Sequence, residues 1–351
     1  MATFLLRTLK AIRRHHHSRQ KGFTLIELLI VTLIAGGIVS GLMFLVVELL
    51  SADQRDASRN ATQQDMQRSM EYISAELREA IFVYSGDQLS EIRDNIPASL
   101  STGGSTPVLA FWKQAPLPSN VIAYCAANSN RADASGNALP IPDAAGRPIP
   151  CAAGHAYSLV VYSLNTAGGG PWTGKARITR YELRQYNNNS GQPTPVPGYV
   201  SPIDGSRNLF ANWPLGVDGT TNRQTPTGTP TGAAVPLTDF VDDEPEGEPT
   251  CPSDNYEISP SNGSGANLSS YPYSFYACVY TGSSSPSPSP SPTPNASQSN
   301  DSIDNQEVIL YLRGNGFGRP SINAETGPNS YRPTLTTRVF NRGTLDINPN
   351  N

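Results

Sequence analysis

The sequence predicts an α+β protein in which a long N-terminal helix, half transmembrane and half amphipathic, packs on antiparallel β-sheets joined by long loops. Three observations predict this fold class. Residues 23–47 form an apolar run with one charged residue, Glu27. No proline precedes Pro97, and all 31 prolines and all four cysteines lie from there onward. Beyond Pro97, short β-like runs alternate with segments rich in turn-forming residues. Because proline interrupts helices, the front of the chain permits a long helix and the back favours strands and loops.

The composition and charge limit the classes of function. With 351 residues, 37% of them hydrophobic, the chain has material for one sizeable core plus long loops. The formal charge is −4, but residues 1–22 contain six basic residues and no acid, which leaves 19 basic and 29 acidic residues in the remainder. An acidic chain is repelled by phosphate, so we expect no nucleic-acid partner.

The apolar run predicts one membrane-spanning helix. At about 1.5 Å per residue, residues 23–47 are long enough to cross roughly 30 Å of hydrocarbon. A cleaved secretory signal has an apolar core of only roughly 7–15 residues, so we expect this segment to be retained. Basic residues precede the run, and acids and bases mix after it. The positive-inside rule therefore places residues 1–22 in the cytoplasm and the C-terminal domain on the other side of the membrane. The chain is thus expected to cross the membrane once.

A helical stripe continues beyond the membrane segment. Apolar residues recur at steps of three or four from residue 66 to residue 84, the spacing of one helix face. The stripe consists of Met66, Met70, Ile73, Leu77, Ile81 and Tyr84. The sequence thus predicts one helix over 23–84, with residues 23–50 in the membrane or a filament core and 51–85 as its amphipathic continuation. We expect Ser85, Gly86 and Asp87 to end the helix.

Residues 86–351 are predicted to form a β-rich extracytoplasmic domain. Six runs have strand character: 108–112, 157–164, 176–186, 273–280, 307–313 and 335–340. The spacers between them include 187–236 and a Ser/Pro repeat at 283–294, which we expect to have no packed structure.

The four cysteines lie on the outer side of the predicted membrane helix. An oxidising compartment favours disulfides, and no CxxC pair indicates zinc or redox chemistry. Four cysteines allow three pairings. We favour Cys125 with Cys151 and Cys251 with Cys278, because each bond closes a Pro/Gly-rich excursion of 26 or 27 residues.

The string KGFTLIELLI at residues 21–30 combines a basic leader, Gly22, the aromatic Phe23 and Glu27 five positions beyond the glycine. It resembles the processing signal of type IV prepilins and type II secretion pseudopilins. The resemblance implies that a prepilin peptidase cuts after Gly22 and methylates Phe23. It also implies a pilin-like fold, a single-pass anchor in the inner membrane, assembly of residues 23–351 with other pilins or pseudopilins, and contact with an inner-membrane assembly platform.

The resemblance also gives Glu27 a role. A carboxylate in a spanning helix costs roughly 2.5 kcal/mol or more, less near the interface. The resemblance implies that the Glu27 carboxylate meets the terminal amine of a neighbouring subunit, which here is that of Phe23. The alternative is that Glu27 lies at the cytoplasmic interface and reaches water. Gly37 and Gly41 form a GxxxG that permits close helix contact, although glycine is also common in membrane helices.

Departures from the major-subunit pattern point to a minor subunit. Many major pilins carry a proline in the membrane segment, and this chain has none there. The long helix, the run 108–112 and the closing run 337–343 resemble W-type minor pilins and J-type minor pseudopilins. The segments 307–315 and 331–334 resemble cyanobacterial pseudopilins linked to hormogonium polysaccharide secretion. That resemblance implies a role in polysaccharide export and gliding motility, and contact with a polysaccharide.

Catalysis is not expected. After cleavage only His155 remains, since His15, His16 and His17 lie in the leader, so no catalytic or metal site based on several histidines can form. An acidic run contains Asp239, Asp242, Asp243, Glu244, Glu246 and Glu248. Such a run offers oxygen ligands for calcium, but prolines interrupt it, so we favour a solvated charged loop. We therefore expect no catalytic residue, no cofactor and no metal.

One alternative of another class remains. In it, the helix is only an anchor and aromatic residues of the outer domain recognise a polysaccharide or a surface, because aromatic faces stack on sugars. The candidate aromatics are Trp112, Trp172, Trp213, Tyr271 and Tyr273.

Overall fold

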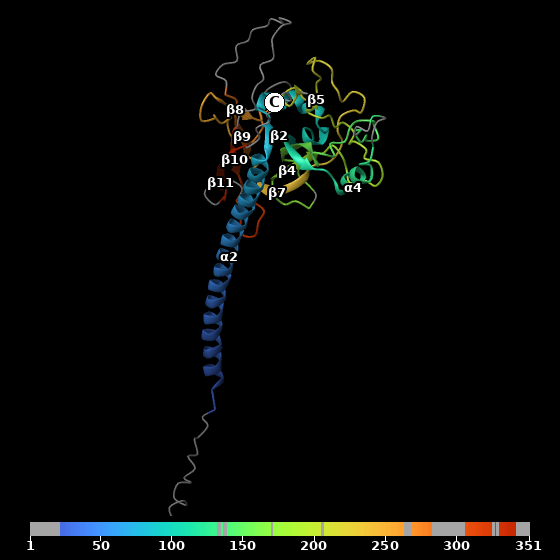
Figure 1. Cartoon of the computed structure of the whole chain (residues 1–351). Helices are drawn as coiled ribbons and strands as arrows, with labels where there is room; N and C mark the ends of the chain where they lie inside the picture. Colours follow the sequence, from blue (N-terminus) through green and yellow to red (C-terminus); the bar gives the residue numbers. More distant parts are fainter. Residues whose placement is uncertain are drawn as a thin grey trace, which may run out of the picture. The chain divides into compact units, whose positions relative to one another are not determined.

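The computed structural model describes residues 22–131, 135, 139–169, 171–204, 207–262, 268–282, 306–324, 327 and 330–341. The basic leader before Gly22 and the Ser/Pro repeat 283–294 lie outside these ranges. The chain divides into two compact units, residues 1–54 and 55–351. Helix α2 (Leu25–Arg78, Figure 1) contributes to both.

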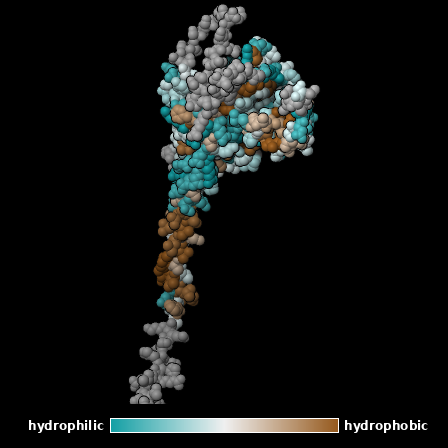
Figure 2. Space-filling view, in the orientation of Figure 1, coloured by the Kyte–Doolittle hydropathy of each residue, from teal (hydrophilic) through white to brown (hydrophobic). Residues whose placement is uncertain are grey.

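The part of α2 in the first unit is mainly apolar. Its large hydrophobic side chains from Leu25 to Leu50 are all exposed in the isolated chain. Figure 2 shows this stretch as an apolar surface on the face in view. By length and composition, α2 meets the requirement of a membrane-spanning helix. The predicted apolar N-terminal helix is therefore confirmed.

The second unit contains two larger antiparallel sheets and one small hairpin (Figure 1). The first sheet has the order β1 (Ala80–Val83), β2 (Ser105–Pro116), β3 (His155–Asn165), β4 (Ala176–Leu183) and β7 (Val235–Val241). The second has the order β11 (Thr334–Phe340), β10 (Glu307–Arg313), β9 (Phe275–Tyr280) and β8 (Tyr256–Ser259). The hairpin pairs β5 (Ile203–Asp204) with β6 (Arg207–Asn208). Short helices fill connections: α3 (Gly86–Ile92), η1 (Arg93–Asn95), η2 (Ala98–Leu100) and α4 (Ser119–Ala127).

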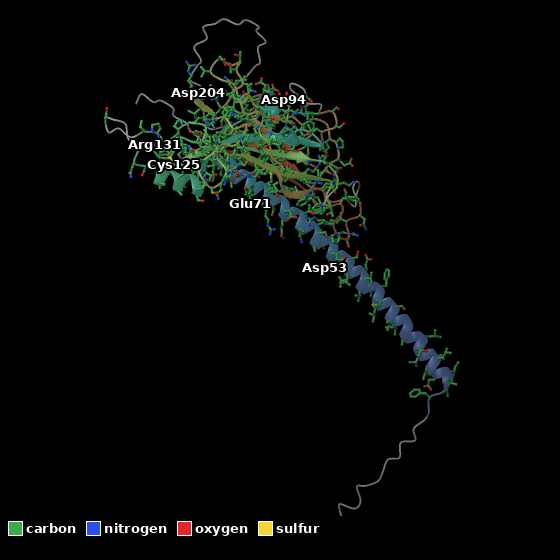
Figure 3. All side chains as sticks on the ribbon, turned by 90° about the vertical axis from the view of Figure 1, so that its right-hand side faces the viewer. Asp53, Glu71, Asp94, Cys125, Arg131 and Asp204 are labelled. Atoms are coloured by element: carbon green, nitrogen blue, oxygen red, sulfur yellow. A yellow bond between two sulfur atoms is a disulfide. The ribbon has the colours of Figure 1, made fainter. Side chains whose placement is uncertain are left out.

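The main core joins the outer half of α2 to both sheets. The helix contributes the expected stripe of Met66, Met70, Ile73 and Leu77, and all four side chains are buried. They pack with residues such as Phe111 and Val160 of the first sheet and Phe275 and Leu310 of the second. Figure 3 shows the part of α2 that carries Glu71 lying along the sheets. The predicted α+β class, with the helix covered by antiparallel strands, is confirmed.

The prediction that the helix extends to Tyr84 is wrong. Helix α2 ends at Arg78, and the next residues form β1, which pairs with β2. The run Ile81-Phe82-Val83-Tyr84 is β-branched and aromatic, so it favours an extended edge strand over another helical turn. Tyr84 is buried, donates to the carbonyl of Phe210 at 2.7 Å and accepts from Nε1 of Trp112 at 2.9 Å.

The expected helix stop at Ser85 is a helix start. The Ser85 hydroxyl accepts from the Gln88 amide, and the Gln88 side chain accepts from the Ser85 amide at 3.0 Å. This reciprocal pair is a capping box, and it begins α3.

All six predicted strand runs form strands, but other strands were missed. The run 176–186 is shorter than expected, since β4 ends at Leu183. The missed strands are β1, β5, β6, β7 and β8. The first residues of β7 lie in the expected spacer 187–236 and its last residues in the acidic run that was expected to be a loop. Pro236 lies inside β7, which is tolerated because β7 is the last strand of its sheet.

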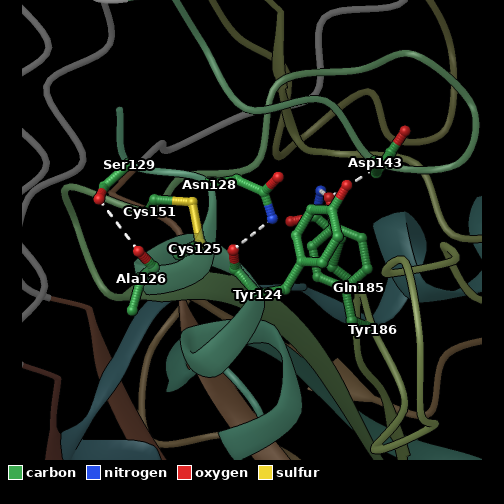
Figure 4. The surroundings of a disulfide bond; sticks show 9 residues. All are labelled: Tyr124, Cys125, Ala126, Asn128, Ser129, Asp143, Cys151, Gln185 and Tyr186. Atoms are coloured by element: carbon green, nitrogen blue, oxygen red, sulfur yellow. Dashed lines mark hydrogen bonds between the residues drawn. A yellow bond between two sulfur atoms is a disulfide. The ribbon is translucent and has the colours of Figure 1, made fainter. Parts of the chain in front are cut away.

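The cysteine pairs agree with the favoured pairing. Cys125 and Cys151 have their Cα atoms 5.7 Å apart, and Cys251 and Cys278 have theirs 5.8 Å apart. Figure 4 shows the first pair, which joins α4 to the loop before β3. Beside it, the Tyr186 hydroxyl donates to Oδ2 of Asp143 at 3.2 Å.

Candidate functional site

The segment before α2 is accessible. Gly22, Phe23 and Thr24 are exposed and precede the first helical residue, with Phe23 78% exposed. The bond between Gly22 and Phe23 therefore lies outside the hydrogen-bonded helix. An extended, unpaired backbone is the form in which a peptidase can bind a substrate strand.

Thr24 and Glu27 define how α2 begins. The Thr24 hydroxyl accepts from the Glu27 amide at 3.3 Å, so Thr24 caps the helix and Glu27 occupies its third position. Thr24-x-x-Glu27 is the sequence of a capping box, a signal that the sequence analysis missed. A carboxylate in the first turn is also stabilised by the partial positive charge of the helix N-terminus. Among the described residues no ion pair involves Glu27.

Gly37 and Gly41 lie on the exposed apolar part of α2. A Cβ placed at either residue would meet no atom within 4 Å, and the same holds for Gly36. Residues four apart share one helix face. The two glycines therefore leave a flat site on that face, where a second helix can approach closely.

A comparison with known families decides the class of this segment. Residues 17–43 match the family model described as the prokaryotic N-terminal methylation motif. This match supports the type IV pilin and pseudopilin superfamily. The prepilin motif implies processing by a prepilin peptidase and assembly with other pilins, and this family is structural rather than catalytic. With the apolar helix, the motif also indicates membrane anchoring. No curated protein and no solved structure matches the chain significantly.

A buried carboxylate in the outer domain was not predicted. Glu76 of α2 is 7% exposed and accepts from Arg180 of β4 through both carboxylate oxygens, at 2.7 and 2.8 Å. Lys113 of β2 donates to the same carboxylate at 2.8 Å, and the hydroxyl of Tyr162 of β3 also donates to it. The helix is thereby bonded to three neighbouring strands.

The environment of Glu76 stabilises its charged form. Burial alone raises the pKa of this carboxyl, but the hydrogen bonds from Arg180, Lys113 and Tyr162 and the charge of Arg180 together lower the pKa to about 2. Burial and the hydrogen bond to Glu76 raise the pKa of the Tyr162 hydroxyl.

The acidic run 239–248 is not simply a solvated loop, which corrects the prediction for Asp242. That residue is fully buried, and its carboxylate accepts from Arg313 and Arg332 at 2.5 Å and from Asn315 at 2.9 Å. Oδ2 of Asp239 accepts from two backbone amides. Within the described ranges, no group of three or more His, Cys, Asp or Glu side chains is arranged to hold a metal.

Four of the five candidate aromatics belong to the core. Trp112, Trp213, Tyr271 and Tyr273 are buried, whereas Trp172 is 40% exposed. The anchored-binder alternative therefore keeps only Trp172 of its proposed contact residues.

His155 is the first residue of β3. Its Nδ1 lies 2.8 Å from the carbonyl of Ala153. The other three histidines lie in the leader, outside the described residues.

Proposed function

We propose that this protein is a minor pilin or pseudopilin, a structural and assembly subunit of a pilus-like or secretion machine. In this proposal the peptidase removes residues 1–22 and methylates the new terminus at Phe23. The observation that carries the proposal is the motif at residues 17–43, which overlaps the start of α2. The apolar side chains of this part of the helix are exposed in the isolated chain. Before assembly these side chains are covered by lipid, and afterwards by neighbouring helices.

The Glu27 carboxylate has two partners in this proposal. Within its own chain it belongs to the first turn of α2, which Thr24 caps and whose partial positive charge favours a carboxylate. In the assembly it meets the methylated amine of Phe23 on a neighbouring subunit. An opposite charge in a low-dielectric environment offsets the cost of burying the carboxylate and sets the axial position of one helix against the next. Gly37 and Gly41 allow the helices to approach.

The minor-subunit role rests on features that a uniform repeating subunit does not need. The apolar stretch has no proline, and the large outer domain carries two disulfides and long loops. We assign residues 23–50 to the filament core or membrane and the domain after β1 to the outer surface. The terminus before Phe23 is cytoplasmic and the domain extracytoplasmic. By resemblance, the machine serves polysaccharide secretion and gliding motility.

The N-terminal mass of the protein purified from membranes tests this proposal. The expected polypeptide begins at Phe23 and carries one methyl group on its amine. A Gly22→Val variant is expected to keep its leader, because a side chain at the cleavage position blocks the peptidase. Gly36→Val is the matched control and is expected to be cleaved. If the wild-type protein keeps Met1 while the machine is active, the proposal is wrong.

A further inference from the structure

A cleft in the outer domain has the chemistry of a carbohydrate site. It has a volume of about 590 Å³ and lies between α2 and the segments around β7. Asp65, Arg68 and Tyr72 of α2 line one side, at helical spacings of three and four residues that place them on one face. Trp172, Asp239 and Arg319 line the other parts.

Two exposed aromatic side chains share this cleft. Trp172 is 40% exposed and Tyr72 is 44% exposed. Tyr72 does not belong to the buried helix stripe, and the Arg180 guanidinium lies 6.0 Å from the centre of its ring. Exposed aromatic rings with no core function offer flat apolar surfaces, and the C–H face of a sugar ring packs on such surfaces.

The loop that carries Trp172 is held in place. Oδ2 of Asp239 accepts from the amides of Thr173 and Gly174, at 3.2 and 2.9 Å. These are the two residues that follow Trp172. Trp172 is therefore presented from an anchored backbone, which lowers the entropy lost when a ligand binds.

The opposite wall is also ordered. Arg319 pairs with Asp65 at 2.6 Å, and its guanidinium lies 3.9 Å from the centre of the Phe240 ring. Phe240 has φ 62°, a conformation that is costly for a non-glycine residue. Its carbonyl accepts from the Asn315 amide at 2.7 Å. Residues in strained backbone conformations persist only where the surrounding structure fixes them, and they cluster at ligand sites.

The charges of the cleft balance. Its ionised side chains are two acids, Asp65 and Asp239, and two bases, Arg68 and Arg319. A negatively charged polymer would gain little net attraction here. Carboxylates and guanidinium groups side by side instead suit sugar hydroxyls, which both donate and accept hydrogen bonds.

We propose that this cleft binds a short segment of a neutral polysaccharide. Sugar rings pack on Trp172 and Tyr72, and their hydroxyls bond with Asp65, Arg68 and Arg319. The volume falls within the range of small-ligand sites, roughly 300–1,000 Å³, whereas protein partners usually cover broader and flatter surfaces. The cleft shares no residue with Gly22, Phe23 or Glu27, so this inference does not depend on filament assembly.

Affinity electrophoresis tests the proposal with the full-length protein in detergent. Native gels contain dextran, starch, mixed-linkage β-glucan or galactomannan as neutral polymers, and polygalacturonate as an acidic one. We expect at least one neutral polymer to retard the wild type. Trp172→Ala and Tyr72→Ala should each weaken binding by about tenfold, whereas Trp172→Phe should keep most of it.

Phe340→Ala is the matched control, because Phe340 is an exposed aromatic on β11, outside the cleft. It is expected to bind like the wild type. If Trp172→Ala fails to fold, Tyr72→Ala carries the test, since Tyr72 is exposed on a helix. The proposal is overturned if no neutral polymer retards the protein, if both alanine variants bind normally, or if only polygalacturonate binds. Loss of a copurifying pilin without any sugar binding would make the cleft a protein interface instead.

The Trp172→Ala protein also separates the two proposals. We expect it to be processed at Gly22 and to enter filaments like the wild type. A defect in processing would show that the variant perturbs more than the cleft.

Discussion

Glu76 and Arg180, 104 residues apart in the chain, form a paired contact in which Nε and an Nη of the arginine each donate to a different carboxylate oxygen, at 2.8 and 2.7 Å. The pair fixes the rotation of the outer half of α2 over β4, because two parallel bonds constrain orientation as well as distance. Tyr162 of β3, the strand next to β4, and Lys113 of β2, the strand beyond β3, complete the site.

Removing the charge of Glu76 is expected to destabilise the outer domain. In Glu76→Gln, Arg180 and Lys113 lose their shared carboxylate while they stay mostly buried. Breaking a buried ion pair by changing one partner costs about 3–5 kcal/mol. Urea unfolding of the full-length protein in detergent, followed by tryptophan fluorescence, measures the loss. Glu71→Gln, on the exposed side of the same helix (Figure 3), is expected to match the wild type. Equal stabilities of the two variants would contradict the assigned role of Glu76.

The Glu76 carboxylate predicts that the stability of the outer domain depends on pH. Its pKa is about 2 in the folded protein and 4.5 without these contacts. Because the folded-state pKa is depressed, the stabilisation is fully present above pH 4.5 and is lost as the pH falls toward 2. The difference corresponds to about 3 kcal/mol. Urea midpoints measured between pH 7 and pH 2 should therefore fall more steeply for the wild type than for Glu76→Gln. Parallel curves would assign the acid sensitivity to other groups.

The contrast between the helix stripe and the Glu76 site shows what the sequence could predict. Met66, Met70, Ile73 and Leu77 recur with the helical period, so a local pattern carries the information about their burial. Glu76 stands beside Leu77 and resembles any exposed acid, because its three partners come from strands whose arrangement no local pattern encodes. The signal at Thr24 and Glu27 was local and was missed. The end of α2 was misplaced because Ile81 and Tyr84 fit the helical period as well as they fit a strand.

A second buried acid gives a test of the corrected acidic run. Asp242→Asn leaves Arg313 and Arg332 without their shared charge, and Asp242 is fully buried. We expect a loss of about 3 kcal/mol or more in the free energy of unfolding. Asp254→Asn changes an exposed acid and is expected to have little effect. If Asp242 were in a solvated loop, the two variants would have equal urea midpoints.

Each disulfide closes a similar length of chain. The sequence separations are 26 and 27 residues, for which the chain-entropy model gives about 3.5 kcal/mol per bond. Mass spectrometry of a non-reduced digest is expected to find Cys125 linked to Cys151 and Cys251 linked to Cys278. Replacing both cysteines of one pair with serine should lower stability by a similar amount for either pair. A linked peptide that joins Cys151 to Cys251 would contradict the pairing.

The effect of the Glu27 charge on assembly can be tested separately from the role of Glu27 in capping α2. Glutamine at the third helical position also satisfies a capping box, so Glu27→Gln is expected to leave the start of α2 intact and to remove only the charge. The neighbouring amine of Phe23 then has no opposite charge in an apolar environment, and we expect incorporation into sheared filaments to fall more than tenfold. Glu48→Gln removes an acid from the same exposed helix and should assemble normally. Both variants should begin at methylated Phe23, which excludes a processing defect. Normal assembly of Glu27→Gln would mean that the carboxylate only caps the helix or reaches interfacial water, and that another contact sets the register between subunits.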